Sequence, residues 1–254
     1  MKKILRISLY ALLGIIAVVF IGSYIYFAAF SPGDKGVPVE GSNLLYFKDT
    51  YDECREGFLA AANDLAFQFE RAELFNLNVP GRIDSSLMID FLYIPPLHDT
   101  NRLLVITSGV HGVEGFTGSA IQQMFMNELI TPDVLSGTGI LLIHALNPFG
   151  FKYGRRVTEN NVDLNRASET DPALFEKINS GYGELYDLLN PSGQVSIYKL
   201  RNQFLYVIAI SKMLKASMAV LRQAVLQGQY EFPEGLYYGG RDFEPQIDSL
   251  KNLL

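Results

Sequence analysis

The sequence predicts an α/β domain preceded by one transmembrane helix, and three observations support this. An apolar segment at the N-terminus, residues 4–30, is interrupted by a single charged side chain. After residue 50, segments with helical apolar spacing alternate with short, continuously apolar segments typical of strands. The composition, 48% hydrophobic and 19% charged, suits a large buried core. This alternation predicts a mixed, mostly parallel sheet with helices on both faces.

The N-terminal apolar segment is predicted to be a single-pass membrane anchor, residues 1–33. It is long enough, because about 20 apolar residues cross the hydrocarbon core as a helix. Lys2, Lys3 and Arg6 lie at its start, and the next basic residue is Lys35. Since cytoplasmic flanks carry the excess of basic residues, we predict a cytoplasmic N-terminus and a domain on the extracytoplasmic side of the bilayer. A cleaved signal peptide is the alternative, and it would export the domain as well.

A short linker and one domain are predicted after the anchor. Residues 34–40 belong to a Pro/Gly-rich stretch without apolar periodicity, and the domain is expected over residues 41–254. Without the three basic residues of the anchor, 18 basic and 27 acidic residues remain, a net charge of -9. This balance provides no basic face for nucleic acid, so no nucleic-acid partner is expected. The only cysteine, Cys54, excludes an internal disulfide and any multi-cysteine metal site, so a metal would need His and carboxylate ligands.

The elements of the domain are predicted from apolar spacing and from residues that end strands. Phe58, Leu59, Ala62 and Leu65 recur at spacings of three and four, as in an amphipathic helix. Two consecutive prolines, at 95 and 96, end the first predicted strand. In chain order we predict a helix over residues 50–71, strands over 87–94 and 102–107, a helix over 116–130, a strand over 139–145, and helices over 171–189, 198–226 and 248–254.

A first polar loop follows the predicted strand 102–107, where the chemistry of an α/β sheet is expected. His111 and Glu114 lie three residues apart in it. On a tight turn or a first helical turn such residues point the same way, so an imidazole nitrogen and a carboxylate can reach one metal ion. The glycines of the loop permit sharp turns and close approach. Alternatively, His111 caps the strand and Glu114 stabilises the dipole of the following helix.

A second polar loop, residues 146–166, follows the predicted strand 139–145. Arg155, Arg156, Asn165 and Arg166 gather positive charge and an amide in an otherwise acidic domain. An arginine binds a carboxylate with two parallel hydrogen bonds, and beside a metal it can stabilise an oxyanion. The loop therefore suits a substrate with a carboxylate. Alternatively, the arginines form ordinary surface ion pairs with nearby acidic residues, namely Glu159, Asp163 and Glu169.

Together the two loops carry a longer pattern. In chain order it reads His111-x-x-Glu114, Asn147-Pro-x-Gly150, Arg156 and Asn161-Val-Asp-Leu-Asn-Arg166. This order resembles the M14 metallopeptidases, the zinc carboxypeptidase superfamily, and most of all its M14-like DUF2817 branch. The resemblance covers about residue 41 to the C-terminus. It implies that His111 and Glu114 bind zinc, that Asn165 and Arg166 bind the terminal carboxylate of the substrate, and that Arg156, rather than Arg155, polarises the scissile carbonyl.

The chain departs from this superfamily in its histidines. Members carry a third zinc ligand, a histidine on a later strand, and further on a glutamate that acts as general base. Here His98, His111 and His144 are the only histidines, and all precede Asn165. His144 could substitute as a ligand, but a packing role suits it better. We therefore expect a domain that is incomplete at its C-terminus, binds zinc weakly or not at all, and is inactive as this chain.

The resemblance implies a function for the intact form. We expect a zinc-dependent metallocarboxypeptidase-like hydrolase that cleaves a peptide or amide bond next to a free carboxylate. Its substrate would be a small peptide or an acylated amino acid. One alternative is an N-acyl amino acid deacylase of the aspartoacylase type, which uses the same residues. Another is an inactive membrane-tethered binding or vestigial module, which the missing ligand favours.

Overall fold

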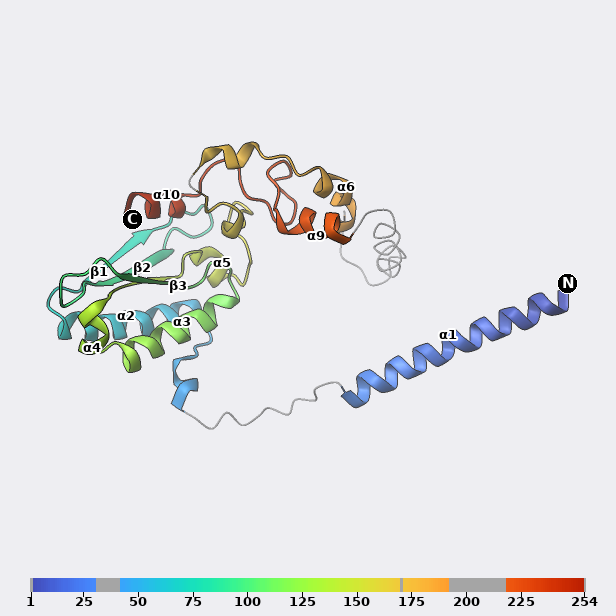
Figure 1. The fold of residues 1–254 in the computed structure, drawn as a ribbon, viewed down its shortest axis with the longest axis horizontal. Helices are drawn as coiled ribbons and strands as arrows, with labels where there is room; N and C mark the ends of the chain where they lie inside the picture. The colour runs from blue at the N-terminus through green and yellow to red at the C-terminus, as the bar shows by residue number, and fades with distance from the viewer. Residues whose placement is uncertain (1, 31–41, 170, 192–217, 254) are drawn as a thin grey trace. The chain divides into compact units, whose positions relative to one another are not determined.

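The chain forms two units, residues 1–44 and residues 45–254, in a computed structural model that describes residues 2–30, 42–169, 171–191 and 218–253. The first unit consists mainly of α1 (Lys2–Phe30), a single continuous helix (Figure 1). Its stretch Arg6–Ile25 is long and apolar enough to cross a membrane, and none of it is buried. An N-terminal signal sequence would have the same properties. The predicted linker lies outside the described residues.

The second unit contains a four-stranded sheet in the order β1-β2-β4-β3. Its strands are β1 (Glu73–Asn78), β2 (Met88–Ile94), β3 (Leu103–Thr107) and β4 (Gly139–His144). The pairs β1–β2 and β2–β4 are antiparallel, and β3–β4 is parallel. The sheet is therefore mixed, as predicted, but its described part is not mostly parallel. The reason is β1, a strand that the apolar pattern does not predict: it returns against β2, which itself runs antiparallel to β4.

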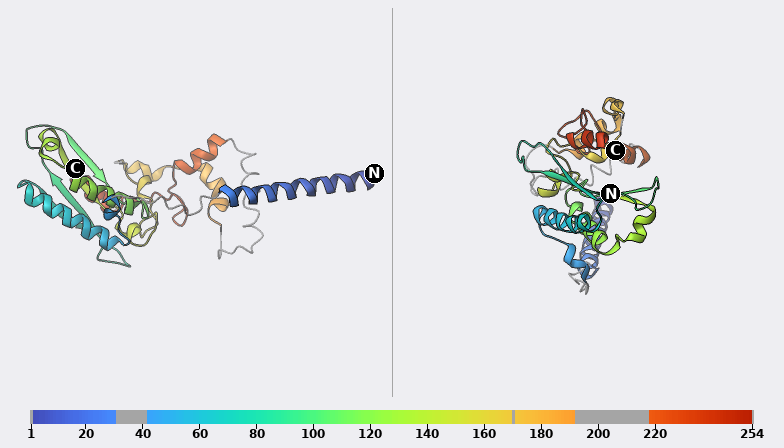
Figure 2. Two further views of the ribbon diagram at one scale, coloured as in Figure 1. Left: turned by 90° about the horizontal axis from the view of Figure 1, so that it is seen from below. Right: turned by 90° about the vertical axis from the view of Figure 1, so that its left-hand side faces the viewer.

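One face of the sheet packs against α2 (Tyr51–Gln68), α3 (Glu114–Met124) and the π-helical turn η2 (Phe125–Leu129) that continues α3 (Figures 1 and 2). Helix α2 begins at a capping box, in which Thr50 accepts a hydrogen bond from the Glu53 amide and the Glu53 carboxylate accepts one from the Thr50 amide. The core of this face consists of buried aliphatic and aromatic side chains, including Phe58, Ala62, Leu65, Leu92, Met126 and Leu142. The helices predicted at 50–71 and 116–130 are confirmed.

The opposite face of the sheet is covered by α10 (Pro245–Leu253) and by the loop after α5 (Pro148–Lys152) (Figure 1). Helix α5 lies between the layers, with Phe149 in this core and Phe151 packed against α2. Its core includes Ile89, Phe91, Ile143, Phe149, Leu164 and Ile247. Helices and loops thus pack on both faces of the sheet, as predicted. The C-terminal helix begins at Pro245, earlier than the predicted residue 248, since proline suits the first turn of a helix.

The segment after residue 166 is more broken than predicted. The single helix predicted over 171–189 is a 3-10 turn, η4 (Pro172–Glu176), followed by α6 (Ser180–Leu189). It breaks because the Asn179 side chain accepts a hydrogen bond from the Tyr182 amide and caps α6. Of the helix predicted over 198–226, residues 198–217 lie outside the described residues, and the remainder is α9 (Met218–Leu226). Two other short helices are α4 (Pro132–Gly137) and the 3-10 turn η1 (Ser42–Tyr46).

Strand β3 forms an edge of the described sheet. Leu103, Leu104 and Val105 are 47%, 40% and 41% exposed, whereas every residue of the neighbouring β4 is buried. Strands β3 and β4 run parallel, so their carboxyl ends lie at the same end of the sheet. The two polar loops of the sequence leave the sheet there, which places the candidate site.

Candidate functional site

The two polar loops are joined to each other directly beyond β3 and β4. The Leu146 amide donates to the Ser108 carbonyl at 2.9 Å, and the Asn147 amide donates to the Gly109 carbonyl at 2.8 Å. The backbone turns sharply in both loops here, since Gly109 and Ala145 have positive φ angles of 67° and 62°. The backbone of the first loop is thus fixed against the second at the carboxyl ends of the parallel strands β3 and β4.

Gly112 lets the first loop pass close under the second. Its amide donates to the Arg155 carbonyl at 3.0 Å, and a Cβ atom at this position would overlap the carbonyl oxygens of Gly150 and Arg155. The Asn147 side chain supports the same turn, because its Oδ1 accepts from the Gly150 amide at 2.9 Å. Only glycine fits at residue 112, and its neighbour His111 is therefore held at a fixed distance from the second loop.

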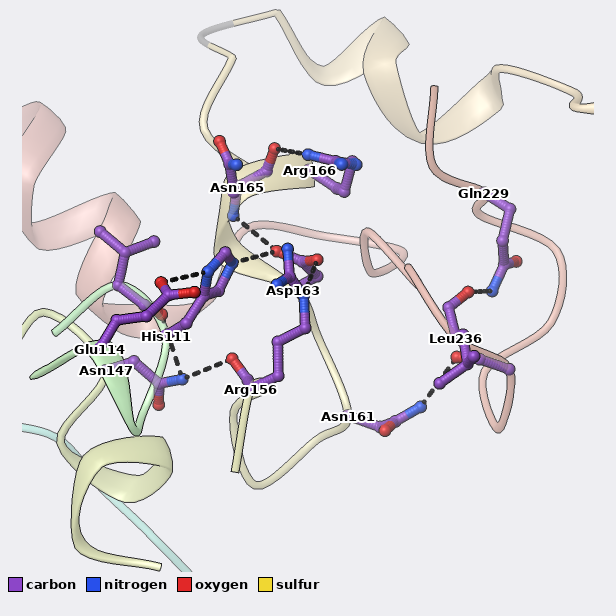
Figure 3. Close-up of polar contacts among 12 residues, drawn as sticks. His111, Glu114, Asn147, Arg156, Asn161, Asp163, Asn165, Arg166, Gln229 and Leu236 are labelled. Carbon is purple, nitrogen blue, oxygen red and sulfur yellow. Dashed lines mark hydrogen bonds and ion pairs between the residues drawn. The ribbon is translucent and has the colours of Figure 1, made fainter. Parts of the chain in front are cut away.

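His111 is buried between two carboxylates (Figure 3). Its Nδ1 lies 2.9 Å from Glu114 Oε2, and its Nε2 lies 3.0 Å from Asp163 Oδ1. Glu114 is the first residue of α3, and its side chain is 71% exposed. The structure therefore brings His111 and Glu114 together. It also agrees with the alternative for Glu114, since an acidic residue in a first helical turn favours the helix dipole.

Asp163 is the centre of the site, although the sequence indicated it only as a surface partner for arginine. It is fully buried. Besides His111, its carboxylate accepts from the Asn165 amide at 3.0 Å and from Arg156 Nε at 3.0 Å (Figure 3). Its own amide donates to the Tyr238 carbonyl at 2.7 Å. The motif Asp-Leu-Asn-Arg could have indicated part of this role, because an aspartate side chain commonly accepts a hydrogen bond from the backbone amide two residues later.

Of the two adjacent arginines in the second loop, one pairs with the Asp163 carboxylate and the other faces solvent. Arg156 pairs with Asp163 and keeps 45% of its side chain exposed, whereas Arg155 is exposed. The other predicted surface partners pair elsewhere: Glu159 with Arg82, and Glu169 with Lys177. The ion-pair alternative therefore holds for Arg156 alone, and its partner is buried rather than on the surface.

His111 and Glu114 have the donor chemistry of a zinc site. Both carboxylates are acceptors, so either ring nitrogen of His111 can donate to its neighbour. With the proton on Nε2, toward Asp163, the Nδ1 lone pair would be available to a metal ion on the Glu114 side. Two ligands each about 2.1 Å from a tetrahedral ion lie about 3.4 Å apart, so the 2.9 Å between Nδ1 and Oε2 is the separation of a hydrogen bond and would widen if a metal ion were bound. Within the described residues no group of three or more His, Cys, Asp or Glu side chains is arranged to hold a metal. The described residues thus place one imidazole beside one carboxylate, two side-chain types that bind zinc in proteins.

Arg166 and Asn165 lie at the end of the same loop, in the 3-10 turn η3 (Leu164–Arg166). Arg166 Nη1 donates to the Asn165 carbonyl at 2.7 Å, while Arg166 Nε is buried and has no partner among the described atoms. The Tyr230 hydroxyl donates to the Arg166 carbonyl at 2.8 Å. Gly228 packs closely against the Arg166 side chain, since a Cβ atom at residue 228 would lie only 2.6 Å from Arg166 Cδ. A buried guanidinium nitrogen without an acceptor suits an anionic oxygen from outside the chain.

His144 does not contact His111 or its two carboxylate partners in the described contacts. Its Nε2 lies 3.0 Å from Ser119 Oγ, and its ring stacks on Phe58 at 4.7 Å between centroids. Burial, together with the Arg55 charge, lowers the pKa of His144 to about 3. Cys54 lies in the same buried region, and burial raises the pKa of its thiol. Both residues have the surroundings of core side chains.

The fold and the site define an α/β protein with a histidine held between two carboxylates at the carboxyl ends of parallel strands. The chain belongs to the DUF2817 family of proteins of unknown function, whose sequence profile matches residues 47–254. No curated protein shows significant similarity to it.

Proposed function

We propose that this protein has the site of a zinc-dependent hydrolase of the M14 carboxypeptidase type, which acts on peptide or amide bonds next to a free carboxylate, and that this chain by itself binds zinc weakly and is inactive. One observation carries the proposal: His111 has Nε2 on buried Asp163 and Nδ1 beside Glu114. A metal-binding histidine commonly donates its second ring N–H to a carboxylate, which fixes the ring and raises its basicity. His111 and Glu114 would hold the zinc, and Asp163 would orient His111. When bound, zinc supplies a water of lowered pKa and polarises a carbonyl.

Arg156 is proposed to stabilise the oxyanion that forms at the attacked carbonyl. Its Nε is occupied by Asp163, which fixes the plane of the guanidinium. The two Nη groups remain for substrate, on a side chain that is 45% exposed. Donors aimed in advance at developing negative charge commonly contribute a factor of about 10²–10³ in rate. Asp163 would thus position two groups at once, His111 and Arg156.

Asn165 and Arg166 are proposed to bind the free carboxylate of the substrate. The support is the buried, partnerless Nε of Arg166, since a carboxylate can accept from Nε and one Nη in parallel. The exposed Asn165 side chain is adjacent and can add an amide donor. This arrangement serves a small peptide and an acylated amino acid equally, because both end in the same carboxylate.

We expect the chain to bind zinc weakly and through His111. Since His111 and Glu114 supply two ligands where a catalytic zinc normally has three, far less than one equivalent should remain after dialysis, as measured by mass spectrometry. In titrations with a chromophoric zinc competitor, His111→Ala should lower the affinity at least about tenfold, because one of two ligands is lost. Asp163→Asn should lower it less. The control is His98→Ala, at an exposed position.

Equal zinc affinity of the wild type and His111→Ala would contradict the proposed metal site. If neither chain binds zinc at any concentration, the function falls to the second candidate, an inactive binding module. That candidate is favoured by the absence of a third converging ligand within the described residues.

The carboxylate site is tested by binding rather than turnover. An N-acylated amino acid with a free carboxylate should bind more tightly than its amide, and Arg166→Ala should remove the difference, because a charge-assisted pair of hydrogen bonds is lost. We expect a loss of about 2–3 kcal/mol, measured by fluorescence polarisation of a labelled compound. Arg155→Ala is the matched control, since Arg155 is exposed. Equal binding of acid and amide to the wild type would reject the assignment.

We also propose that α1 anchors the protein in the membrane with the second unit outside the cytoplasm. The support is the length and apolar character of Arg6–Ile25 together with the basic residues before it. The protein should sediment with membranes. Added protease should digest residues 45–254 only after the outer barrier of the cell is opened, as followed by immunoblotting. Full-length protein in the cytosolic fraction would contradict both the anchor and the export.

A further inference from the structure

A second polar site lies at the start of α10, and the proposed hydrolase does not use it. A cavity of about 20 Å³ is enclosed there by the loop between β1 and β2, the loop after α5 and the first turn of α10. Its lining includes Thr158, Glu159, Asn160, Glu244 and Gln246. A space of this size holds one water molecule or one ion of similar size. The lining chemistry decides which of these it accepts.

Glu244 is a buried carboxylate without a basic partner in the described contacts. It is 8% exposed, and its carboxylate accepts from Asn160 Nδ2 at 3.2 and 3.4 Å and from the Thr158 side chain. The cavity has a second acidic residue, Glu159, whose negative charge repels that of Glu244. Burial, and to a smaller extent the charge of Glu159, raise the pKa of Glu244. A buried carboxylate in these surroundings needs either a proton or a cation.

Gln246 supplies an independent observation. It is 2% exposed, and its Oε1 has no hydrogen-bond partner among the described atoms. A buried amide oxygen without a donor is costly, and a cation in the same cavity would satisfy it. Gln246 is in the first turn of α10, two residues after Glu244. The cavity therefore joins two carboxylates and an unsatisfied amide oxygen.

We propose that this cavity is a calcium site formed by Glu244, Gln246 and Glu159. All available donors are oxygens, which hard cations prefer, whereas zinc favours nitrogen and sulfur. Magnesium demands near-ideal octahedral geometry, which two carboxylates and one amide from separate segments do not supply. Calcium accepts irregular sets of carboxylate and amide oxygens and exchanges its waters readily.

A bound calcium ion would link three segments that are distant in sequence. Glu244 and Gln246 belong to the start of α10. Glu159 accepts from the backbone amides of Arg82 and Ile83 at 2.8 and 3.0 Å, so it already holds the β1–β2 loop. The loop after α5 also carries Asp163, so calcium would stabilise the backbone that presents this residue. Calcium binding itself does not depend on the proposed hydrolase.

Calorimetric titration of calcium into the full chain in detergent micelles, after treatment with a chelator, tests the proposal. We expect one equivalent to bind and calcium to raise Tm. Glu244→Gln should weaken binding at least about tenfold, because a ligand charge is lost, and Gln246→Glu should strengthen it at least about tenfold, because one is gained. Glu234→Gln, at an exposed acidic position, is the matched control and should leave the affinity unchanged.

The signs of these effects separate calcium from a protonated carboxylate or a trapped water. In calcium-free buffer at neutral pH, Gln246→Glu should lower Tm, and calcium should restore it. The proposal would be overturned if calcium titration gave no heat of binding, or if neither Glu244→Gln nor Gln246→Glu changed the calcium affinity. It would also be overturned if sodium alone restored Tm as calcium does. His111→Ala should bind calcium as the wild type does, so failure of the zinc site and failure of the calcium site are distinguishable.

Discussion

Gly112→Ala is expected to destabilise the second unit by about 3–4 kcal/mol. The added methyl group would overlap two backbone carbonyl oxygens, those of Gly150 and Arg155, and backbone atoms cannot move aside as the end of a side chain can. Separating the loops would also break the hydrogen bond from the Gly112 amide to the Arg155 carbonyl, worth about 1 kcal/mol. Urea unfolding of the full chain in detergent measures the change. It is followed by circular dichroism, with the signal of α1 treated as constant.

Gly154→Ala provides the matched control in the same loop region. Gly154 has a positive φ of 61°, but nothing lies within 4 Å of an added Cβ atom. Its substitution should therefore cost only the backbone strain of a left-handed alanine, about 1 kcal/mol. A loss at Gly112 no larger than that at Gly154 would show that the two loops separate easily. The fixed placement of His111 would then be wrong.

Acid is expected to destabilise the second unit through His144. The pKa of His144 is about 3 in the folded protein and about 6.5 in an unfolded chain, so below pH 6.5 the unfolded state takes up a proton that the folded state does not. The stability that depends on neutral His144 is fully present above pH 6.5 and is lost as the pH falls from about 6.5 to about 3. Each pH unit in this window costs up to about 1.4 kcal/mol, which gives about 2 kcal/mol at pH 5.

His144→Gln removes the titrating group while keeping a side chain that can hydrogen bond to Ser119. We expect a lower free energy of unfolding at pH 7.5 but a flatter profile between pH 6.5 and 4.5, as measured by urea unfolding at several pH values. His98→Gln, at an exposed position, should retain the wild-type slope. If His144→Gln and the wild type lose stability in parallel on acidification, His144 is not buried in its neutral form.

Much of the second unit could be predicted from sequence because its apolar periodicity is strong and local. Strands β2, β3 and β4 follow continuous apolar runs, helices α2 and α3 follow apolar side chains at helical spacing, and the prolines after Ile94 end β2. Strand β1 could not be predicted in this way, because Glu73–Asn78 is short and half-polar and gains its strand conformation by pairing with β2. That pairing made the described sheet less parallel than expected.

For the site, the sequence by itself determined which chemical groups are available: one imidazole and one carboxylate three residues apart, and an Asn-Arg pair in a second loop. It also determined the apolar character of α1. Only the tertiary structure decided that buried Asp163 joins His111, Arg156 and the Asn165 backbone, and that Glu244, Gln246 and Glu159 share one cavity. Local spacing fixes what neighbouring side chains can reach. Burial and contacts between segments far apart in sequence depend on how strands β3 and β4 and helix α10 pack, which no local pattern contains.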